Sequence, residues 1–530
     1  MVEYKFLGRQ QQLETLEKRI RGLKQGYRQN IAVVGDELVG KTSIIHQFLS
    51  KFYDPGIILI YLEARPESLA AFTKRFIGVL LYNFLLNSGI PLKEDLNFLI
   101  GKSSRFIPRT IEKINHVLNS VEKRKKNDIF AELLGLCETI NAETSKFCVV
   151  IFDEFHNLES IGVNNLYEEW SKVLLTQKNT MNIIISSMKF KTRSILSKNL
   201  SLLFGNFEMM EVEPFDIKTS EDYLSQKKLI TGLKPGLKNF IVNFTGGYPF
   251  YLELIGNSLL KSPEGGLVEA LEGLLFESSG ILHQRFSNYL KRFLDSPSSQ
   301  EYISILYSIS SGHNKIKDIS HIMRKPQREL NLRINSLLEL DCISRSGDFL
   351  KINDRVLGFW LRFVYQQKLD SLTYDAKNQK ALFRDYIQGL ITDFLKQEEK
   401  PVIDRVTELF RLFGDDIVQI DTKKLRLDHF KEIKPIELSG RSLKDILIGR
   451  SNDSVWIMAI KPDMLTEDFV AEFSRECRRY RNKTQKKIIV TLRDCDCNAR
   501  LRALEEKIWM WDLNNLNQIF DLFSKPRLIV

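Results

Sequence analysis

The chain has 530 residues, which at about 150 residues per domain predicts three or four domains. Its content of 43% hydrophobic and 27% charged residues is ordinary for a globular protein and excludes wholesale disorder or a collagen-like fibre. Lysine and arginine number 77 against 67 acidic residues, and the net charge of +10 permits a polyanionic partner without requiring one.

The N-terminal residues and the longest apolar run indicate where in the cell the protein is located. The segment MVEYKFLGRQQ contains an acidic residue and no apolar core of a secretory signal. The longest apolar run, from Phe76 to Leu86, is interrupted by Asn83 and is shorter than the ~20 residues that a membrane span needs. The sequence therefore predicts a cytoplasmic protein without a membrane partner.

Four apolar runs in the first part of the chain predict buried strands. They are NIAVV (30–34), GIILIYL (56–62), FCVVIF (147–152) and NIIISS (182–187). Runs of this kind, alternating with helices, are typical of a parallel sheet that is covered on both faces. We therefore expect an α/β domain over residues 1–215, with a mostly helical insertion over residues 67–140.

The insertion contains a basic segment. Residues 102–127 hold eight basic side chains against two acidic ones. A solvated face is the favoured interpretation, and contact with a polyanion is the alternative.

The loop after the first strand carries the strongest functional signal. Residues 35–42 read GDELVGKT and match G-x-x-x-x-G-K-[ST] in full. In such a loop, backbone N–H groups and the positive end of the next helix bind phosphates. Lys41 is expected to neutralise phosphate oxygens, and the Thr42 hydroxyl to ligate Mg²⁺. The predicted nucleotide-binding residues here are Gly35, Asp36, Glu37, Leu38, Val39, Gly40, Lys41, Thr42 and Ser43.

A second segment agrees with this loop. The run FCVVIFDE (147–154) is a buried strand that ends in two carboxylates, the form of a Walker B segment. Asp153 is predicted to hold Mg²⁺. Glu154 is predicted to be the catalytic residue that orients and polarises water, because phosphoryl transfer depends on positioning and charge neutralisation. The two segments together predict ATP and Mg²⁺ as cofactors.

These motifs resemble those of a known family. The series Phe6-Leu7-Gly8-Arg9, the phosphate loop, VVIFDEF, NIIISSM and Gly246-Gly247-Tyr248-Pro249 resembles the archaeal-type ATPases, which belong to the STAND branch of AAA+ relatives, close to the origin-recognition ATPases. The resemblance covers residues 1–370. It implies that Phe6, Gly8 and Arg9 lie near the adenine. It also implies that Ser186 or Ser187 senses the γ-phosphate, and that Pro249 lets a helical lid contact the nucleotide.

One departure from the family concerns positive charge. Members often carry a Gly-Arg pair before the strand that leads into the lid, whereas this chain reads LFGNF (203–207), with Asn206 in that place. The arginine would then come from Arg193 or from a partner subunit. The resemblance therefore implies slow turnover and assembly in the ATP state, as a homo-oligomer or with a partner subunit.

A winged helix is predicted over residues 295–370, after a helical lid over 216–294. Helices at 301–311, at 315–323 and from Pro326 onward precede a hairpin (342–352) that turns at Gly347. Arginine and asparagine on an exposed third helix suit contacts with double-stranded DNA. Docking of a protein is an alternative of equal weight. The candidate DNA-binding residues are Arg328, Asn331, Arg333 and Asn335.

The tail, residues 371–530, is predicted to hold linker helices and a domain that resembles the restriction-endonuclease-like fold. In that resemblance, Asp445 is the metal-binding aspartate and Lys461 the active-site lysine. Ala459 stands where an active enzyme has an acidic residue, so we expect a degenerate site that does not cut DNA. Glu437 and Asp463 are the candidates for a migrated carboxylate.

The predicted fold class is thus α/β: a P-loop, AAA+/STAND-like parallel-sheet domain with a helical lid, a winged helix and an α/β endonuclease-like C-terminal domain. The predicted function is slow ATP hydrolysis in a nucleotide-dependent switch that binds DNA and assembles with itself. The alternative is a signalling scaffold that binds ATP as a structural ligand and docks a protein.

Overall fold

The computed structural model describes residues 6–86, 92–123, 128–200, 207–226, 233–261, 266–294, 299–370, 375–420, 423–436, 445–480 and 484–529. The chain forms two compact units. Unit 1 comprises Met1–Thr219 with Tyr248–Phe250 and Glu339–Asp341, and unit 2 comprises the rest of the chain. The sequence-based boundaries at 294 and 370, which lie inside unit 2, stay predictions.

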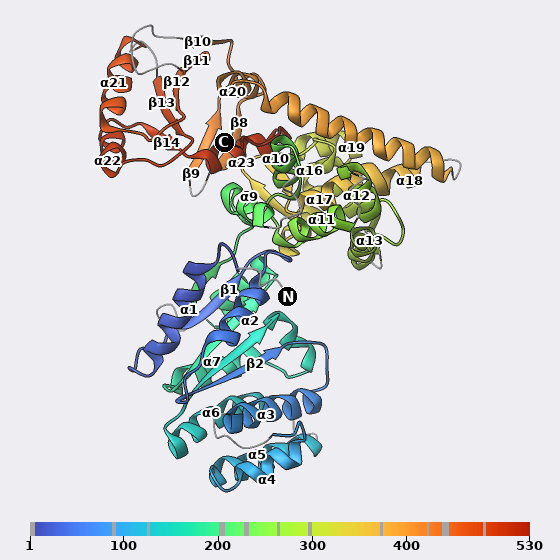
Figure 1. Cartoon of the computed structure of the whole chain (residues 1–530), viewed down its shortest axis with the longest axis vertical. Helices are drawn as coiled ribbons and strands as arrows, with labels where there is room; N and C mark the ends of the chain where they lie inside the picture. Colours follow the sequence, from blue (N-terminus) through green and yellow to red (C-terminus); the bar gives the residue numbers. More distant parts are fainter. Residues whose placement is uncertain are drawn as a thin grey trace. The chain divides into compact units, whose positions relative to one another are not determined.

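Unit 1 is built on a parallel sheet of five strands in the described residues, in the order β2-β3-β4-β1-β5 (Figure 1). Every residue of β1 and β4 is buried, as expected for strands that helices cover on both faces. The predicted α/β class is confirmed, and the four predicted strands lie within two residues of their expected positions. The strands are β1 (Asn30–Val34), β2 (Ile57–Glu63), β3 (Phe147–Asp153), β4 (Thr180–Ser186) and β5 (Phe207–Glu211).

The segment between β2 and β3 is helical, as expected. Figure 1 shows α3, α4, α5 and α6 gathered beside the sheet. Their apolar side chains pack with β3 in one core, in which the ring of Phe152 lies 6.4 Å from that of Phe72 and 5.3 Å from that of Trp170. The helices of unit 1 are α1 (Gln10–Leu23), α2 (Lys41–Lys51), α3 (Leu69–Leu86), α4 (Leu96–Ser103), α5 (Pro108–Glu122), α6 (Ile129–Thr144), α7 (Leu166–Thr176), α8 (Lys189–Lys198) and the 3₁₀-helix η1 (Phe155–Ile161).

Helix α3 has the length and apolar composition of a membrane span. Half of its apolar window is buried, and Phe72, Phe76 and Leu80 pack in the core beside the sheet. A buried core helix meets the same criteria, so α3 is weak evidence for a span, and the cellular location stays a prediction.

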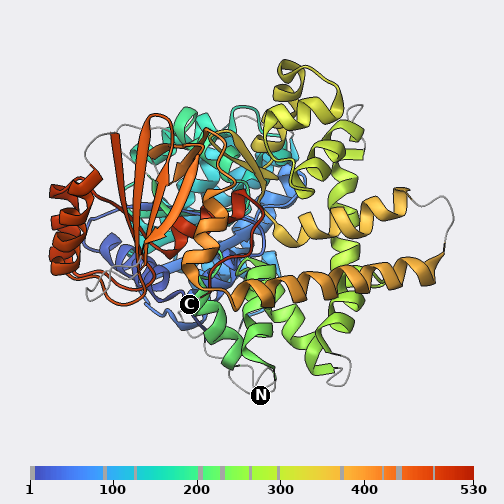
Figure 2. The same cartoon turned by 90° about the horizontal axis from the view of Figure 1, so that it is seen from above.

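Unit 2 begins with helices α9 to α13 and continues with three helices and a hairpin, in the order predicted for a winged helix. Figure 2 shows its longest helix, α19, in orange. The helices are α9 (Ile217–Gln226), α10 (Pro235–Thr245), α11 (Pro249–Lys261), α12 (Gly266–Leu275), α13 (Ile281–Leu294), α14 (Ser299–Ser310), α15 (Ile316–Met323), α16 (Gln327–Glu339), α17 (Arg355–Trp360), the π-helix η2 (Leu361–Tyr365), α18 (Gln366–Asp370), α19 (Ala376–Glu398), α20 (Val402–Phe410), α21 (Glu467–Cys477), the 3₁₀-helix η3 (Arg478–Tyr480), α22 (Cys497–Glu505) and α23 (Leu513–Leu522).

The tail contains a second sheet, in the order β10-β11-β12-β13-β14, which is antiparallel from β10 to β12 and parallel from β12 to β14. Side chains of β12 alternate between two cores. Trp456 and Met458 pack with α20 and α23, whereas Ile457 and Ala459 pack with α21 and α22. The strands of unit 2 are β6 (Ile343–Ser346), β7 (Phe349–Ile352), β8 (Asp416–Ile420), β9 (Lys423–Leu427), β10 (Glu432–Ile436), β11 (Asp445–Arg450), β12 (Ser454–Lys461), β13 (Thr484–Thr491) and β14 (Trp509–Trp511).

The β6–β7 hairpin, the predicted wing, packs against the tail of the same chain. The backbone N–H of Asp348 donates to the Ile417 carbonyl over 2.9 Å, and the Ile417 N–H donates to the Asp348 carboxylate over 2.7 Å. Phe349 is buried in the core of the tail, with its ring 5.1 Å from that of Phe523. At the turn, Gly347 has φ +62°, and a Cβ there would lie 2.1 Å from the Ile417 carbonyl oxygen, so only glycine fits. The wing is therefore a contact surface for strand β8.

Candidate nucleotide site

The phosphate loop joins β1 to α2. Gly40 has φ +93°, and a Cβ on Gly35 would lie 2.2 Å from the Val212 carbonyl oxygen, so both positions need glycine. Lys41 is 4% exposed, and its Nζ donates to the carbonyl oxygens of Gly35 (3.0 Å) and Asp36 (2.7 Å). Burial lowers the pKa of Lys41, and nearby carboxylates, Glu154 first, oppose this shift. The sequence-predicted residues Glu37, Leu38 and Val39 lie on this loop, and Ser43 is exposed on the first turn of α2.

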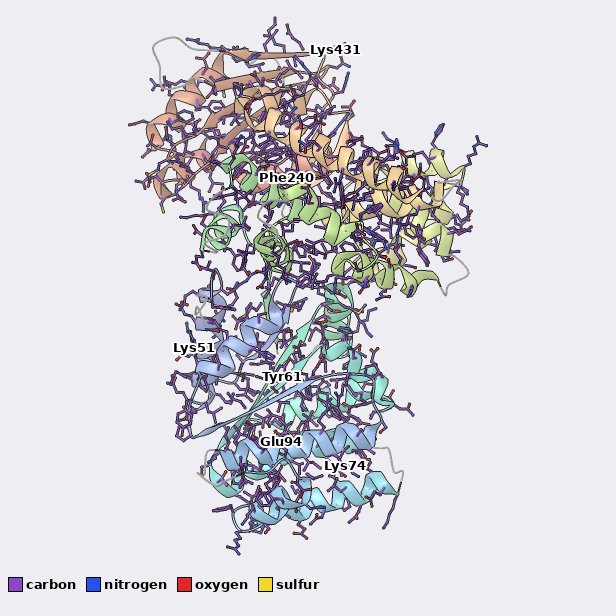
Figure 3. The ribbon with its side chains drawn as sticks, turned by 45° about the vertical axis from the view of Figure 1, so that its right-hand side comes forward. Lys51, Tyr61, Lys74, Glu94, Phe240 and Lys431 are labelled. Carbon is purple, nitrogen blue, oxygen red and sulfur yellow. The ribbon has the colours of Figure 1, made fainter. Side chains whose placement is uncertain are left out.

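The hydroxyl and carboxylate predicted to hold Mg²⁺ meet at the end of β3. Thr42 Oγ1 donates to Asp153 Oδ2 over 2.8 Å, and Asp153 is 2% exposed. Tyr61 on β2 (Figure 3) donates its hydroxyl to the same oxygen over 2.8 Å. Burial and the Asp153 charge raise the pKa of Tyr61, so it stays a donor at neutral pH. Sequence reasoning missed Tyr61, since only the pairing of β2 with β3 brings it to Asp153.

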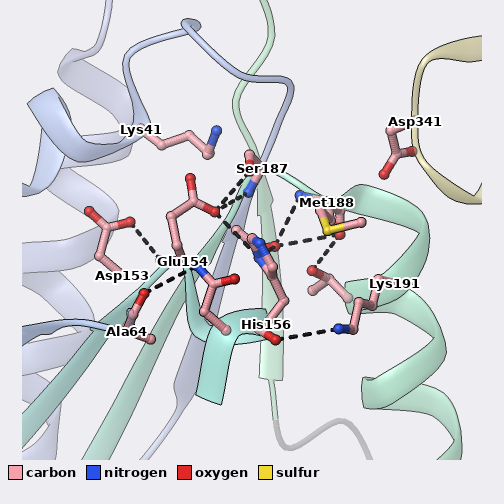
Figure 4. A network of polar contacts seen from close by, with 12 residues as sticks. Lys41, Ala64, Asp153, Glu154, His156, Ser187, Met188, Lys191 and Asp341 are labelled. Atoms are coloured by element: carbon pink, nitrogen blue, oxygen red, sulfur yellow. Dashed lines mark hydrogen bonds and ion pairs between the residues drawn. The ribbon is translucent and has the colours of Figure 1, made fainter. Parts of the chain in front are cut away.

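Glu154 is held in place by Ser187 (Figure 4). Its backbone is left-handed, with φ +47°, at the point where β3 ends. Ser187 donates to Glu154 Oε2 from both its backbone N–H (3.0 Å) and its hydroxyl (2.8 Å). Burial raises the pKa of Glu154, while the Ser187 bonds and Lys41 oppose that shift. The structure thus brings together the predicted catalytic residue and Ser187, one of the two serines predicted as a sensor.

The second predicted sensor, Ser186, contacts a histidine that sequence reasoning did not single out. His156 Nδ1 lies 3.0 Å from Ser186 Oγ and 3.4 Å from Glu154 Oε2. Burial, with the Lys191 charge, lowers the pKa of His156 to about 4, so the imidazole is neutral at pH 7. The available signal was its position two residues after Glu154 in DEFH. Glu154, His156 and Ser187 belong to one polar network (Figure 4), and Ser186 joins it through His156.

The N-terminal residues reach the phosphate loop through Arg9. Its guanidinium is buried and donates to the carbonyl oxygens of Val39 (3.0 Å) and Glu213 (2.6 Å). It also lies 4.8 Å from the centre of the Phe215 ring. Gly8 has φ +66°, and Phe6 is half-buried. Arg9 therefore fixes the backbone of the loop, and contact of these three residues with adenine stays a prediction.

Asp36 of the loop has two further partners in unit 1. Lys189 Nζ lies 2.7 Å from Asp36 Oδ1, and the Tyr248 hydroxyl lies 3.2 Å from Asp36 Oδ2. Tyr248 directly precedes Pro249, the first residue of α11 and the third predicted sensor. Contact between Pro249 and the nucleotide stays a prediction.

The geometry assigns an arginine finger neither to Arg193 nor to a partner subunit, the two predicted sources. Asn206 lies outside the described residues. Arg193 on α8 is exposed and pairs with Glu211 of β5. An arginine from a partner subunit stays a prediction.

The predicted DNA-binding residues do not form one exposed face. Arg328 and Asn335 on α16 are exposed, and Asn331 is half-buried. Arg333 is occupied, because its Nε lies 2.8 Å from the Glu301 carboxylate, and this bond raises the pKa of Arg333. Between the exposed polar residues, Leu332 has 65% of its surface exposed. The wing, which would flank such a helix on DNA, packs on β8.

The structure does not bring the two residues of the predicted degenerate nuclease site together. Asp445 lies directly opposite Ile460 in the antiparallel β11–β12 pair, so these two share a face of the sheet. Lys461 lies on the other face with Ala459, and its Nζ is 5.2 Å from the Phe469 ring of α21. Asp445 and Lys461 therefore cannot act together at one metal site. Glu437 lies outside the described residues, and Asp463 is exposed in the segment after β12.

Residues 6–255 match the model of a family described as an ATPase domain predominantly from Archaea. Residues 6–255 are an archaeal-type ATPase domain. The resemblance drawn from the motifs is thus confirmed for this part of the chain.

Among solved structures, the chain resembles the Walker-type ATPase PABY2304 of Pyrococcus abyssi, with a TM-score of 0.50, 19% identity, and coverage of 68% of this chain and 97% of that one. At this identity the likeness shows a shared fold and not a shared activity. A weaker likeness links it to the ORC2 protein of Aeropyrum pernix, with a TM-score of 0.41, 10% identity, and coverage of 74% and 97%.

One curated relative is the helicase subunit XPD of general transcription and DNA repair factor IIH from Schizosaccharomyces pombe. It is 26% identical over 236 residues, which are 44% of this chain and 25% of that protein. The chain thus matches only a quarter of that relative's length.

Proposed function

We propose that this protein hydrolyses ATP at the site formed by the phosphate loop and the end of β3, and that nucleotide turnover makes it a switch. The observation that carries the proposal is the convergence of four side chains from the loop and β3. Lys41 and Thr42 open α2, Asp153 ends β3 and Glu154 follows it, with Thr42 and Asp153 in direct contact. This set matches what phosphoryl transfer needs: a cation for the phosphates, oxygen ligands for Mg²⁺ and a carboxylate for water.

The residues fit a nucleotide with Mg²⁺. A threonine hydroxyl and an aspartate carboxylate are hard oxygen ligands of the kind that Mg²⁺ prefers. Bound Mg²⁺ neutralises charge on the phosphate oxygens. Lys41 binds the phosphates, and the Glu154 carboxylate, oriented by Ser187, positions water and accepts its proton. The neutral His156 adds no positive charge that would compete for this carboxylate.

The test compares two variants in an ATPase assay and in a binding assay with a fluorescent ATP analogue. Lys41→Ala should lose binding, because Lys41 meets phosphate charge in the ground state. Glu154→Gln should keep binding and lose about 100-fold or more in turnover, as expected for loss of a general base. Wild-type turnover in Glu154→Gln would refute the role of Glu154.

Assembly with another subunit is part of the proposal. Within the described residues Arg193 is paired with Glu211, which supports an arginine supplied by a second copy. Turnover per subunit should then rise with protein concentration. A specific activity that stays constant from nanomolar to micromolar protein would contradict assembly.

A second candidate function is docking of a protein, instead of DNA, by the winged helix. Three observations favour it: the wing packs on β8, Arg333 is paired with Glu301, and Leu332 is exposed on α16. Duplex DNA affinity measured against salt separates the two, because phosphate contacts give a steep log–log slope and apolar docking does not.

A further inference from the structure

Unit 2 contains one buried carboxylate surrounded by three cations. Asp521 on α23 has 1% of its side chain exposed. Its Oδ2 accepts from Lys351 Nζ (2.7 Å) and Arg527 Nη2 (2.8 Å), and its Oδ1 accepts from Arg527 Nε (3.1 Å) and from Arg355. These residues come from β7, from the start of α17 and from the segment after α23. The cluster therefore joins the hairpin, α17 and the tail within unit 2.

The cluster has a surplus of positive charge. Lys351, Arg355 and Arg527 together carry three positive charges, and Asp521 carries one negative charge. Burial acts to raise the pKa of Asp521, but the charges of Arg355, Lys351 and Arg527 outweigh it and hold that pKa far below its usual range. The carboxylate is therefore ionised throughout the neutral range. Lys351 and Arg355 keep 32% and 21% of their side chains exposed, so they can meet a further partner.

A cavity of about 250 Å³ lies against this cluster. Lys351, Arg355 and Lys525 line it, and Asp521 is the one acidic residue in its wall among the residues that the structure describes. Asn243 fixes two of the basic residues, because its side-chain oxygen accepts from Arg355 (3.2 Å) and from the backbone N–H of Arg527 (3.1 Å). The lining also includes the apolar side chains of Phe244, Phe359 and Leu390. The volume is slightly below the ~300–1,000 Å³ of pockets for drug-sized ligands.

We propose that this cavity binds a small phosphate-bearing molecule, with the phosphate against Lys351, Arg355 and Lys525. Charge-assisted bonds from ammonium and guanidinium groups to phosphate oxygens are short and strong. The apolar wall suits an uncharged remainder of the ligand. The wall comes from α10, β7, α17, α19 and the segment after α23, so a bound ligand stabilises their mutual packing in unit 2. This site is separate from the phosphate loop, and the proposal does not depend on ATP hydrolysis.

The experiment titrates pyrophosphate and inorganic phosphate into the full chain by calorimetry. The Lys41→Ala background weakens phosphate binding at the loop in unit 1, so that the remaining signal reports on the cavity. Lys525→Glu should weaken pyrophosphate binding at least tenfold. Lys525 is half-buried and lies outside the Asp521 cluster, so this variant should fold. The matched control is Lys396→Glu, an exposed lysine of α19, which should bind as the parent does.

A second variant, Lys351→Met, removes charge from the cluster itself and should show the same loss. Thermal melting in pyrophosphate provides an independent measurement, because a ligand of the folded state raises the melting temperature. Equal binding by the parent and Lys525→Glu would overturn the proposal. Binding of a 20-base-pair duplex without binding of pyrophosphate or phosphate would also overturn it, since the ligand would then be a nucleic acid.

Discussion

Thr42 Oγ1 and Asp153 Oδ2 lie 2.8 Å apart, although 111 residues separate them along the chain. If both hold the same Mg²⁺, their effects should not be additive. Thr42→Ala and Asp153→Asn should each raise the Mg²⁺ concentration that gives half-maximal hydrolysis. The double variant should be less impaired than the sum, with a coupling of about 0.5–3 kcal/mol. If the effects of Thr42→Ala and Asp153→Asn on the Mg²⁺ requirement are strictly additive, the two residues do not hold the same ion.

The contact between Ser187 and Glu154 predicts a change in pH dependence. Burial raises the pKa of Glu154, and the Ser187 hydroxyl opposes that shift by bonding to the ionised form. Hydrolysis should fall as pH decreases through this pKa, because the protonated carboxyl cannot accept a proton. Ser187→Ala should raise the pKa further and move the acid limb of the kcat profile to higher pH. A limb that stays in place, or moves to lower pH, would show that Glu154 is not the titrating group.

Arg328 and Arg333 should differ in a DNA-binding assay. If α16 contacts duplex DNA, Arg328→Ala should weaken binding by about 1–3 kcal/mol where the side chain touches a base. Arg333→Ala should have a smaller effect on affinity, because its guanidinium is engaged by Glu301. The measurement is affinity at fixed salt for both variants. Unchanged affinity in Arg328→Ala would favour docking of a protein.

Asp521→Asn should destabilise unit 2. It leaves Lys351, Arg355 and Arg527 without their shared carboxylate, which for a fully buried group costs ~3–5 kcal/mol. These cations are partly exposed, so we expect about 2–3 kcal/mol at pH 7. Because the pKa of Asp521 is lowered in the folded state, its stabilisation is present above the ordinary value of 3.8 and is lost as pH falls below it. Denaturant unfolding at pH 7 and at pH 3 checks this, and an equal difference at both would contradict it.

The tail should not nick supercoiled plasmid with Mg²⁺ or Mn²⁺ and ATP. Asp445 and Lys461 lie on opposite faces of the sheet, and Ala459 is buried beneath α21. A metal-binding carboxylate and a lysine on opposite faces of a sheet cannot act on the same phosphate. Nicking that vanishes in Asp445→Ala would refute this account of the tail.

The sequence alone determined the parts of the protein that depend on local chemistry. The four buried strands follow from runs of β-branched residues. The phosphate loop follows from its glycines, because positions 35 and 40 accept no residue other than Gly35 and Gly40. A buried strand that ends in Asp153 and Glu154 likewise placed two carboxylates at the edge of the sheet. These features need no knowledge of distant partners.

Strand β5 and the side-chain network around Glu154 required the tertiary structure. The residues FEMME (207–211) carry only a weak strand signal, and their pairing with β1 makes them a strand. Tyr61, His156 and Ser187 became part of the site through the pairing of β2, β3 and β4. No local pattern specifies which side chains will meet across neighbouring strands.

The tail shows most clearly which features could not be predicted from the sequence. The resemblance to an endonuclease-like fold implied that Asp445 and Lys461 belong to one site, but side chains of a strand alternate between the two faces of a sheet with a period of two. A difference of one residue in register therefore moves a side chain to the other face, which is why Asp445 lies opposite Ile460 and not opposite Ala459. The packing of the wing on β8 and the convergence of Lys351 and Arg355 on Asp521 were decided in the same way, by contacts between segments 69 to 170 residues apart. Sequence fixes which groups are present, and long-range packing fixes which of them meet.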